Sequence, residues 1–197
     1  TFFPFSARQA DKLIAVVGMC GSGKSIATEY LENQGWTKLY FGGITYKLMA
    51  EAGIERTPDG KSEKEFREKL RQDHGPECYA KFLEPDIKEA LKVGNVVLDG
   101  LYSWYEYKYL IERFPELKLI CVVVDKKLRY DRIANRVDRP WTREDAIYRD
   151  VSEIENLAKG GPIAYSDYFL FNNGSMDDYY KRLKEILEDI NKHEGEK

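Results

Sequence analysis

The chain alternates short apolar runs with longer stretches in which apolar residues recur at helical spacing. Runs of about four to eight apolar residues between turn residues are typical of buried strands, and the longer period is typical of amphipathic helices. The predicted strands cover residues 13–17, 37–41, 95–99, 117–124 and 168–171. The predicted helices cover 26–33, 44–51, 62–72, 85–92, 106–114, 126–137 and 143–158, with a last helix starting at Ser175. Strands that alternate with helices indicate a parallel sheet covered on both faces.

A glycine-rich segment separates the first predicted strand from the first predicted helix. The stretch Gly18-Met19-Cys20-Gly21-Ser22-Gly23-Lys24-Ser25 fits the pattern G-x-x-x-x-G-K-[ST]. In this context, backbone N–H groups wrap a polyphosphate, Lys24 reaches the β- and γ-phosphates, and the Ser25 hydroxyl can ligate Mg²⁺. The alternative is a glycine turn with an incidental lysine. We expect ATP and Mg²⁺ as cofactors, bound by Gly18, Gly21, Ser22, Gly23, Lys24 and Ser25.

Composition narrows the class of protein. A chain of 197 residues with 43% hydrophobic residues fits a single domain. The net charge of −3 comes from 31 basic and 34 acidic residues spread along the chain, so no basic face supports a nucleic-acid partner. The three cysteines have neither the number nor the spacing of a disulfide framework or a zinc site, which predicts a cytoplasmic protein. No apolar run approaches the length of a membrane span, so no membrane partner is expected.

Two aspartates are candidates for the carboxylate that holds Mg²⁺ together with Ser25. Asp99 ends the strand predicted over 95–99, and Asp125 follows the strand predicted over 117–124. Either can hold Mg²⁺ at the carboxyl edge of the sheet. We favour Asp99, because Gly100 lets the chain turn tightly beside a ligand, whereas Asp125 runs straight into a helix whose N-terminus favours an acidic residue. Asp99 is also placed to orient or deprotonate the acceptor.

Three arginines gather near the end of the helix predicted over 126–137. Arg132, Arg136 and Arg139 follow one another at steps of four and three residues, so they present three guanidinium groups together. We expect Arg132 and Arg136 to act in catalysis and Arg136 and Arg139 to contact the nucleotide, because phosphoryl transfer depends on neutralising charge. The alternative is a solvated face on which the arginines pair with acidic neighbours. Those neighbours are Asp131, Asp138 and Glu144.

Basic side chains after the second predicted strand are candidates for the acceptor site. Lys47 follows that strand, and Arg67 and Arg71 lie on the strongly charged helix predicted over 62–72. In a kinase of this layout these positions face the acceptor's phosphate, and we expect Lys47 and Arg71 to bind substrate. The alternative is an ordinary amphipathic surface helix.

Taken together, these features resemble the nucleoside-monophosphate-kinase-like group of P-loop kinases. Within that group the chain is most similar to dephospho-CoA kinase and to archaeal adenylate-kinase-related proteins. The similarity runs along most of the chain. The matching segments are Gly18 to Ser25, Leu70-Arg71 with His74 to Pro76, Val97 to Gly100, Arg132 to Arg136 with Arg149-Asp150, and Asp167-Tyr168 with Asn172 to Ser175.

The resemblance implies a fold and an assignment of parts. It implies a three-layer α/β P-loop NTPase fold, with a five-stranded parallel sheet of order 2-3-1-4-5 and helices on both faces. Residues 1–197 would form one kinase domain. Its parts would be a core over 12–42 and 85–192, an acceptor-binding helical insert over 43–84 and a lid over 136–143. The resemblance also implies that Arg149 binds the substrate and that Asn173 lies near the adenine.

The chain departs from these relatives on the acceptor side. Such kinases usually carry an aspartate where this chain has Gly42-Gly43, and the related archaeal proteins have an arginine near Tyr102. The usual acceptor contacts are therefore partly missing.

Three hypotheses for function follow. The leading one is an ATP- and Mg²⁺-dependent phosphotransferase that moves the γ-phosphate to a small nucleotide-like acceptor, such as a nucleoside monophosphate or a dephospho-CoA-like molecule. The second is a P-loop ATPase or switch that binds a protein partner, although Asn191-Lys192-His193-Glu194 fails the N-K-x-D pattern at its last position. The third is a kinase acting on a nucleotide hydroxyl in nucleic acid, against which the missing basic stripe argues.

Overall fold

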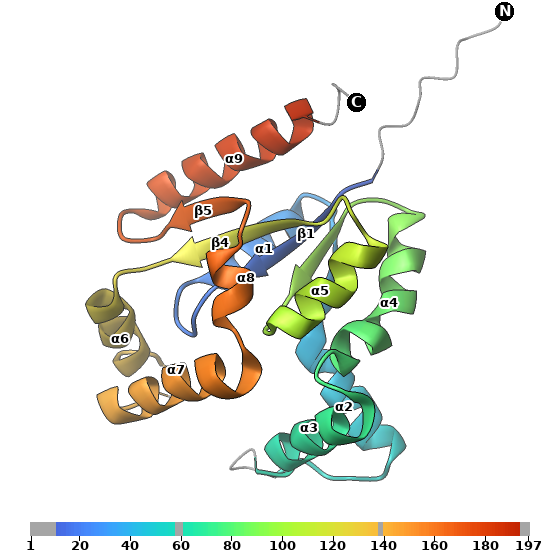
Figure 1. The fold of residues 1–197 in the computed structure, drawn as a ribbon. Coiled ribbons are helices and arrows are strands. Elements are labelled where there is room, and N and C mark those ends of the chain that lie inside the picture. The colour runs from blue at the N-terminus through green and yellow to red at the C-terminus, as the bar shows by residue number, and fades with distance from the viewer. Residues whose placement is uncertain (1–10, 58–60, 138–139, 194–197) are drawn as a thin grey trace, which may run out of the picture.

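The strands form one parallel sheet. The computed structural model describes residues 11–57, 61–137 and 140–193. The strands are β1 (Leu13–Val17), β2 (Thr37–Tyr40), β3 (Val96–Asp99), β4 (Lys118–Val123) and β5 (Tyr168–Phe171). They pair in parallel in the order β2-β3-β1-β4-β5 (Figure 1). The predicted fold class and strand order are therefore confirmed.

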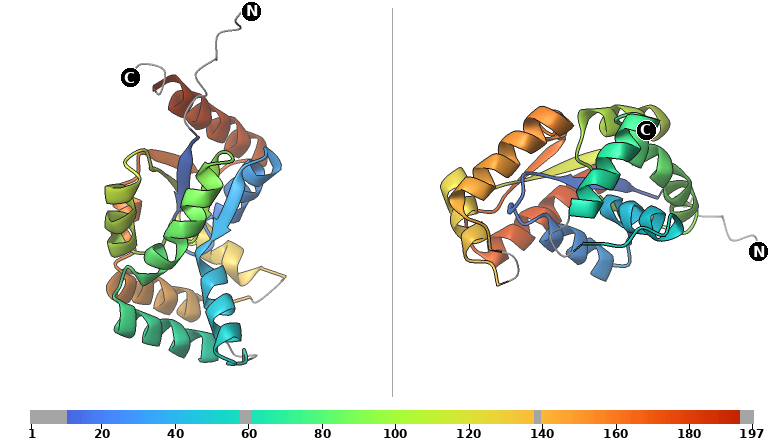
Figure 2. Two further views of the ribbon diagram at one scale, coloured as in Figure 1. Left: turned by 90° about the vertical axis from the view of Figure 1, so that its right-hand side faces the viewer. Right: turned by 90° about the horizontal axis from the view of Figure 1, so that it is seen from below.

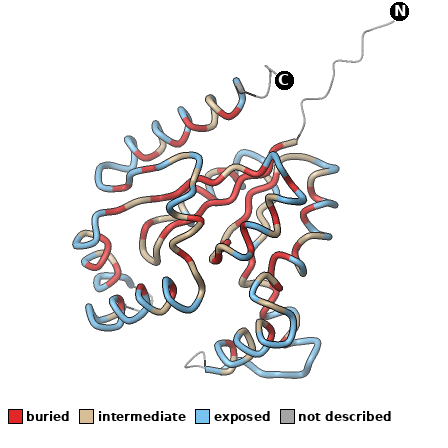
Figure 3. The backbone as a smooth tube through the Cα atoms, in the orientation of Figure 1, coloured by how far each residue is buried: buried red, intermediate tan, exposed pale blue. Residues whose placement is uncertain are grey.

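Helices cover both faces of the sheet. Successive side chains of a strand point to opposite faces; Ala15 and Val17 pack into one core cluster, whereas Ile14 and Val16 pack into the other. The first cluster includes side chains of α4 (Cys78–Leu91) and α5 (Trp104–Arg113), and the second includes side chains of α1 (Lys24–Asn33) and α9 (Met176–His193). Burial on both faces explains why β1 is apolar at every position. Figure 2 gives two further views of these layers, and Figure 3 shows the buried strands between the helices.

The remaining helices extend past the edge of the sheet at which the strands end. One group is α2 (Phe41–Glu51) with α3 (Lys61–His74), and the other is α6 (Lys126–Ala134) with α7 (Arg143–Leu157). Figure 1 shows the two groups on either side of this edge. The short α8 (Gly160–Ala164) connects α7 to β5. The phosphate loop and Asp99 therefore lie at the edge that both groups flank.

Several local predictions differ from the structure. Phe41, predicted to end a strand, begins α2, three residues before the predicted helix start. The helix predicted over 85–92 begins at Cys78, because buried apolar residues upstream continue its packed face and outweigh the cost of Pro85 inside the helix. The helix predicted over 126–137 ends at Ala134, so Arg136 lies in the turn beyond it. Gly160-Gly161-Pro162, expected to be a hinge-like break, forms α8, in which Gly161 lies directly against the ring of Trp104. Asp138 and Arg139 lie outside the described residues.

Candidate active site

The phosphate loop is built around glycines that other residues cannot replace without strain. Gly18 has a φ of +143°, and a Cβ on it would lie 2.5 Å from the carbonyl oxygen of Val122. Gly23 has a φ of +95°, and a Cβ there would lie 2.4 Å from Nδ2 of Asn172. Residues that carry a Cβ rarely adopt such φ values, and at these two positions the Cβ would also be too close to the neighbouring atoms. The loop between β1 and α1 is therefore closely packed against the ends of β4 and β5.

Asn172, at the end of β5, links the loop to α6. Its Nδ2 donates to the carbonyl oxygen of Ser22 at 2.9 Å, and its own backbone oxygen accepts from Nη1 of Arg132 at 2.7 Å. The side chain is buried. Sequence reasoning named the neighbouring Asn173 instead, whose Oδ1 accepts from the N–H of Asp125 at 2.9 Å. The motif contains no signal for Asn172, because its partner is a backbone group 150 residues away.

Lys24 stands at the first position of α1 with its ammonium folded back over the loop. Its Nζ donates to the carbonyl oxygen of Met19 at 3.0 Å. Burial and then the charge of Lys159 lower the pKa of Lys24 to about 8, although Cys20, Glu153 and Asp99 oppose the shift. Lys24 is thus still protonated at neutral pH but is held in a site that disfavours its charge. An anion beside it would relieve that cost.

The loop fits a polyphosphate and a magnesium ion. The N-terminus of α1 has no side-chain cap, so its first N–H groups remain available for an anion. Ser22 Oγ is buried and, among the described residues, has no hydrogen-bond partner. Ser25 is exposed in the first turn of α1. Among the described residues, no three acidic, histidine or cysteine side chains cluster as a metal site, so Mg²⁺ here would take most of its oxygen ligands from phosphate and water.

Asp99 and Asp125 occupy different environments. Asp99 ends β3, where it pairs in register with Val16 of β1. Burial raises the pKa of Asp99, although the charges of Lys24 and Lys38 oppose the shift. Asp125 is exposed at the start of α6, and its side chain does not cap that helix. Of the two aspartates, Asp99 is the one whose charge raises the pKa of Lys24.

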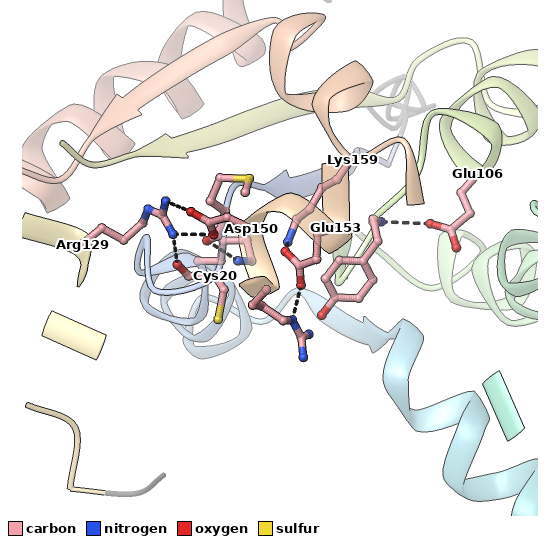
Figure 4. Close-up of polar contacts among 10 residues, drawn as sticks. Cys20, Glu106, Arg129, Asp150, Glu153 and Lys159 are labelled. Carbon is pink, nitrogen blue, oxygen red and sulfur yellow. Dashed lines mark hydrogen bonds and ion pairs between the residues drawn. The ribbon is translucent and has the colours of Figure 1, made fainter. Parts of the chain in front are cut away.

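Helix α7 is joined to the loop by an ion pair that the sequence did not predict. Arg129 of α6 donates from Nη1 to Asp150 Oδ1 at 2.9 Å and to the carbonyl oxygen of Cys20 at 2.8 Å (Figure 4). Tyr130 also donates to Asp150, at 2.9 Å. Both members of the pair are buried. Asp150 therefore fixes the arginine that holds the backbone of the loop.

Replacing Asp150 with alanine should destabilise the fold. The change would leave Arg129 buried without its carboxylate, and breaking a buried pair in this way costs roughly 3–5 kcal/mol. We expect a loss of that size in the free energy of unfolding measured with urea. Glu155→Ala, at an exposed position of the same helix, should change it by less than about 0.5 kcal/mol. Equal losses of unfolding free energy in the two variants would show that the Arg129–Asp150 pair stabilises the fold no more than an exposed side chain does.

One turn further along α7, Glu153 binds two cations. Its Oε1 accepts from Nε of Arg149 at 2.7 Å, and its Oε2 pairs with Nζ of Lys159 (Figure 4). Glu153 and Lys159 are buried, whereas about half of the Arg149 side chain is exposed. Burial would raise the pKa of Glu153, but Lys159 and Arg149 outweigh it and hold that pKa below its usual value.

The other predicted site residues are spread around the loop. Arg132 donates to the backbone oxygen of Asn172, and the guanidinium of Arg136 lies 6.0 Å from the centroid of the Trp141 ring. Lys47 is exposed on α2. Arg71 stands over the Tyr79 ring at 4.9 Å, and its buried Nε has no hydrogen-bond partner among the described residues.

A parallel sheet of this order with a phosphate loop after its first strand defines a P-loop nucleotide-binding protein. The family model described as an AAA domain matches residues 14–156. A UPF0200 protein of Thermococcus gammatolerans is 35% identical over 183 residues, which cover 90% of this chain and 95% of that protein. A UPF0200 protein of Thermococcus kodakarensis is 33% identical over 183 residues, covering 90% and 97%. The chain belongs to the UPF0200 family of this AAA-domain class.

Solved structures with the same fold include kinases. Dephospho-CoA kinase from Campylobacter jejuni is 19% identical with a TM-score of 0.56, covering 91% of this chain and 97% of that one. Shikimate kinase from Bacteroides thetaiotaomicron is 11% identical with a TM-score of 0.57, covering 92% and 99%. At these identities the likeness establishes the fold alone. No helix in the described part of the chain has the length and apolar character needed to cross a membrane.

Proposed function

We propose that this protein is an ATP- and Mg²⁺-dependent phosphotransferase acting on a small nucleotide-like or otherwise hydroxyl- or phosphate-bearing acceptor. The observation that carries the proposal is the half-buried Asp99 within electrostatic reach of Lys24, at the sheet edge that α2 and α3 flank. A carboxylate there can serve both the metal and an acceptor hydroxyl. Nucleotide binding alone would not need the acceptor-side helices.

Each part of the site has a role in this proposal. Lys24 and the backbone N–H groups of the loop hold the β- and γ-phosphates, while Ser25 and Asp99 hold Mg²⁺. The metal, when bound, neutralises charge on the transferring group. Arg132 and Arg136 follow β4 and contribute positive charge on the nucleotide side, together with Arg139.

The acceptor would enter from the α2–α3 side. Arg71 is held against Tyr79 and close to the buried carboxylate of Glu106, so it is a positioned cation rather than a freely moving surface side chain. Arg149 stands on α7 within electrostatic reach of Tyr40 at the end of β2. With Lys47, these cations favour an anionic acceptor. Asp99 would orient its hydroxyl or phosphate.

The test is consumption of ATP with Mg²⁺ across a panel of nucleoside monophosphates, deoxynucleotides, dephospho-CoA and short oligonucleotides, with phosphorylated acceptors detected by mass. One acceptor that gives product in proportion to the ATP consumed would establish a kinase and name its substrate. Slow hydrolysis that is indifferent to every acceptor would favour the ATPase or switch hypothesis. Phosphorylation of oligonucleotides alone would favour a kinase of nucleic acid.

The affinity for ATP should fall as pH rises through about 8. Lys24 has a lowered pKa of about 8 in the nucleotide-free protein, and only its protonated form attracts phosphate. Below that pH the affinity should be nearly constant, and above it the dissociation constant should rise by up to about tenfold per pH unit. Calorimetric titration at fixed Mg²⁺ between about pH 7 and 9.5 measures this. Lys24→Arg, which stays charged, should abolish the dependence, and an unchanged wild-type affinity at pH 9 would contradict the assignment.

A further inference from the structure

Lys159 is a buried cation that the proposed reaction does not use directly. It precedes α8, is 2% exposed, and lies 4.9 Å from the ring centroid of Tyr102. Lysine is almost never fully buried without a partner. Its partner is Glu153, and its charge also lowers the pKa of Lys24. The buried charge of Lys159 disfavours the charge of Lys24, which is unfavourable for the protein by itself. This indicates that Lys159 has a specific role.

The charge balance around Glu153 suggests that role. A carboxylate paired with Arg149 alone would form a neutral pair, and a neutral pair offers little attraction to phosphate. With Lys159 on its other oxygen, the group of three side chains carries a net charge of +1. Arg149 donates to Glu153 from its Nε and lies 5.6 Å from the centroid of the Trp141 ring. Within the described part of the chain, its two terminal nitrogens are therefore available to donate to a ligand.

Arg149 is the member of this group that a ligand can reach. About half of its side chain is exposed, whereas Glu153 and Lys159 are enclosed. It also lies within electrostatic reach of Cys20 in the phosphate loop and of Tyr102 beside Asp99. Its partner Glu153 is paired with Lys159, which lies 4.9 Å from the ring centroid of Tyr102, three residues after Asp99 at the end of β3. This places the group at the edge of the sheet that carries the phosphate loop, where a nucleotide bound to Lys24 would extend its terminal phosphate.

We propose that Lys159 neutralises Glu153 so that Arg149, held by the same carboxylate, keeps its positive charge for the γ-phosphate. Lys159 and Glu153 are then positioning residues, and Arg149 contacts the γ-phosphate, the group that passes to the acceptor, so this role adds to its proposed place on the acceptor side. This inference rests on the proposed binding of ATP at the loop, but it does not require that any particular acceptor be correct. It predicts that Lys159 increases the preference of the protein for ATP over ADP, although Lys159 contacts neither nucleotide.

The experiment compares the dissociation constants of ATP and ADP, with Mg²⁺, for a set of full-length variants. Lys159→Met leaves a neutral Arg149–Glu153 pair and should lower the preference for ATP by about tenfold, the worth of one charge-assisted hydrogen bond. The double variant Lys159→Met with Glu153→Gln removes both buried charges. Its Gln oxygen can still accept from Arg149, the net charge returns to +1, and the preference should return to within about threefold of wild type.

Lys92→Met is the matched control. It also breaks a lysine–glutamate pair, with the exposed Glu89 in the last turn of α4. Helix α4 leads into the start of β3, so this pair lies at the edge of the sheet opposite to the phosphate loop. The preference of Lys92→Met for ATP over ADP should equal that of wild type. Thermal unfolding of every variant separates changes in stability from changes in binding, since removing both members of a buried pair is often neutral for stability.

Several outcomes would overturn the inference. It fails if Lys159→Met keeps the wild-type preference, or if the double variant is as impaired as the single one. Should Lys159→Met fold poorly, Arg149→Gln in the double-variant background decides, because the preference must then be lost. Wild-type protein that binds neither nucleotide would refute both this inference and the proposed function. Preference for ATP that follows the predicted pattern, without any phosphorylated acceptor, would support the inference and count against the phosphotransferase.

Discussion

Replacing Lys24 with alanine should reduce phosphate transfer by about a thousandfold or more while leaving the fold intact. Removing one preorganised charge from the transferring group commonly costs a hundredfold to a thousandfold, and here the ground-state contact with the β-phosphate is lost as well. In the described part of the chain, the Lys24 side chain donates its hydrogen bond to the carbonyl oxygen of Met19, within the loop itself. Because burial and Lys159 already disfavour the charge, its removal should not destabilise the protein.

The measurement is product formation by mass at saturating acceptor, with ATP affinity determined in parallel. Lys127→Ala, an exposed lysine on α6, is the matched control and should retain wild-type turnover and affinity. Wild-type turnover in Lys24→Ala would remove the loop lysine from the mechanism. A variant that unfolds at a much lower temperature would instead show that Lys24 is structural.

The fold was predictable because its signals are local. Each strand is an apolar run bounded by turn residues, and the phosphate loop is a contiguous motif whose strand and helix context is visible in the sequence. The strand order came from resemblance rather than from periodicity, and the pairing of β1 with β3 and β4 confirms it. Element ends were less predictable, as Pro85 inside α4 illustrates, because tertiary packing decides them.

The support around the site was not predictable, because its partners are distant in sequence. Asn172 donates a hydrogen bond to Ser22, 150 residues away in sequence, and Arg129 donates to Cys20, 109 residues away. No pattern of charges within one helix identifies which arginine faces inward. Spacing favours Arg132, Arg136 and Arg139, whereas the buried arginine is Arg129. Composition likewise gave no reason to single out Lys159 among the basic residues of the chain.

The choice between the two aspartates can be decided by a pair of isosteric variants. Asp99→Asn should lower turnover by about a hundredfold or more, because the amide can neither neutralise Mg²⁺ nor take a proton from an acceptor hydroxyl. Asp125→Asn should change turnover by no more than about twofold, as expected for an exposed side chain that does not cap its helix. The variants differ from wild type by the same atoms, so steric effects largely cancel between them.

Magnesium dependence separates the two roles of Asp99. If the carboxylate holds the metal, Asp99→Asn should raise the Mg²⁺ concentration needed for half-maximal turnover. If it acts only on the acceptor, turnover should fall at every Mg²⁺ concentration with that midpoint unchanged. Full activity in Asp99→Asn combined with a loss in Asp125→Asn would transfer the metal-side role to Asp125, at the end of the strand on the other side of β1. The burial of Asp99 beside Lys24 argues for the first outcome, because a carboxylate with a raised pKa in that position gains most from a divalent cation.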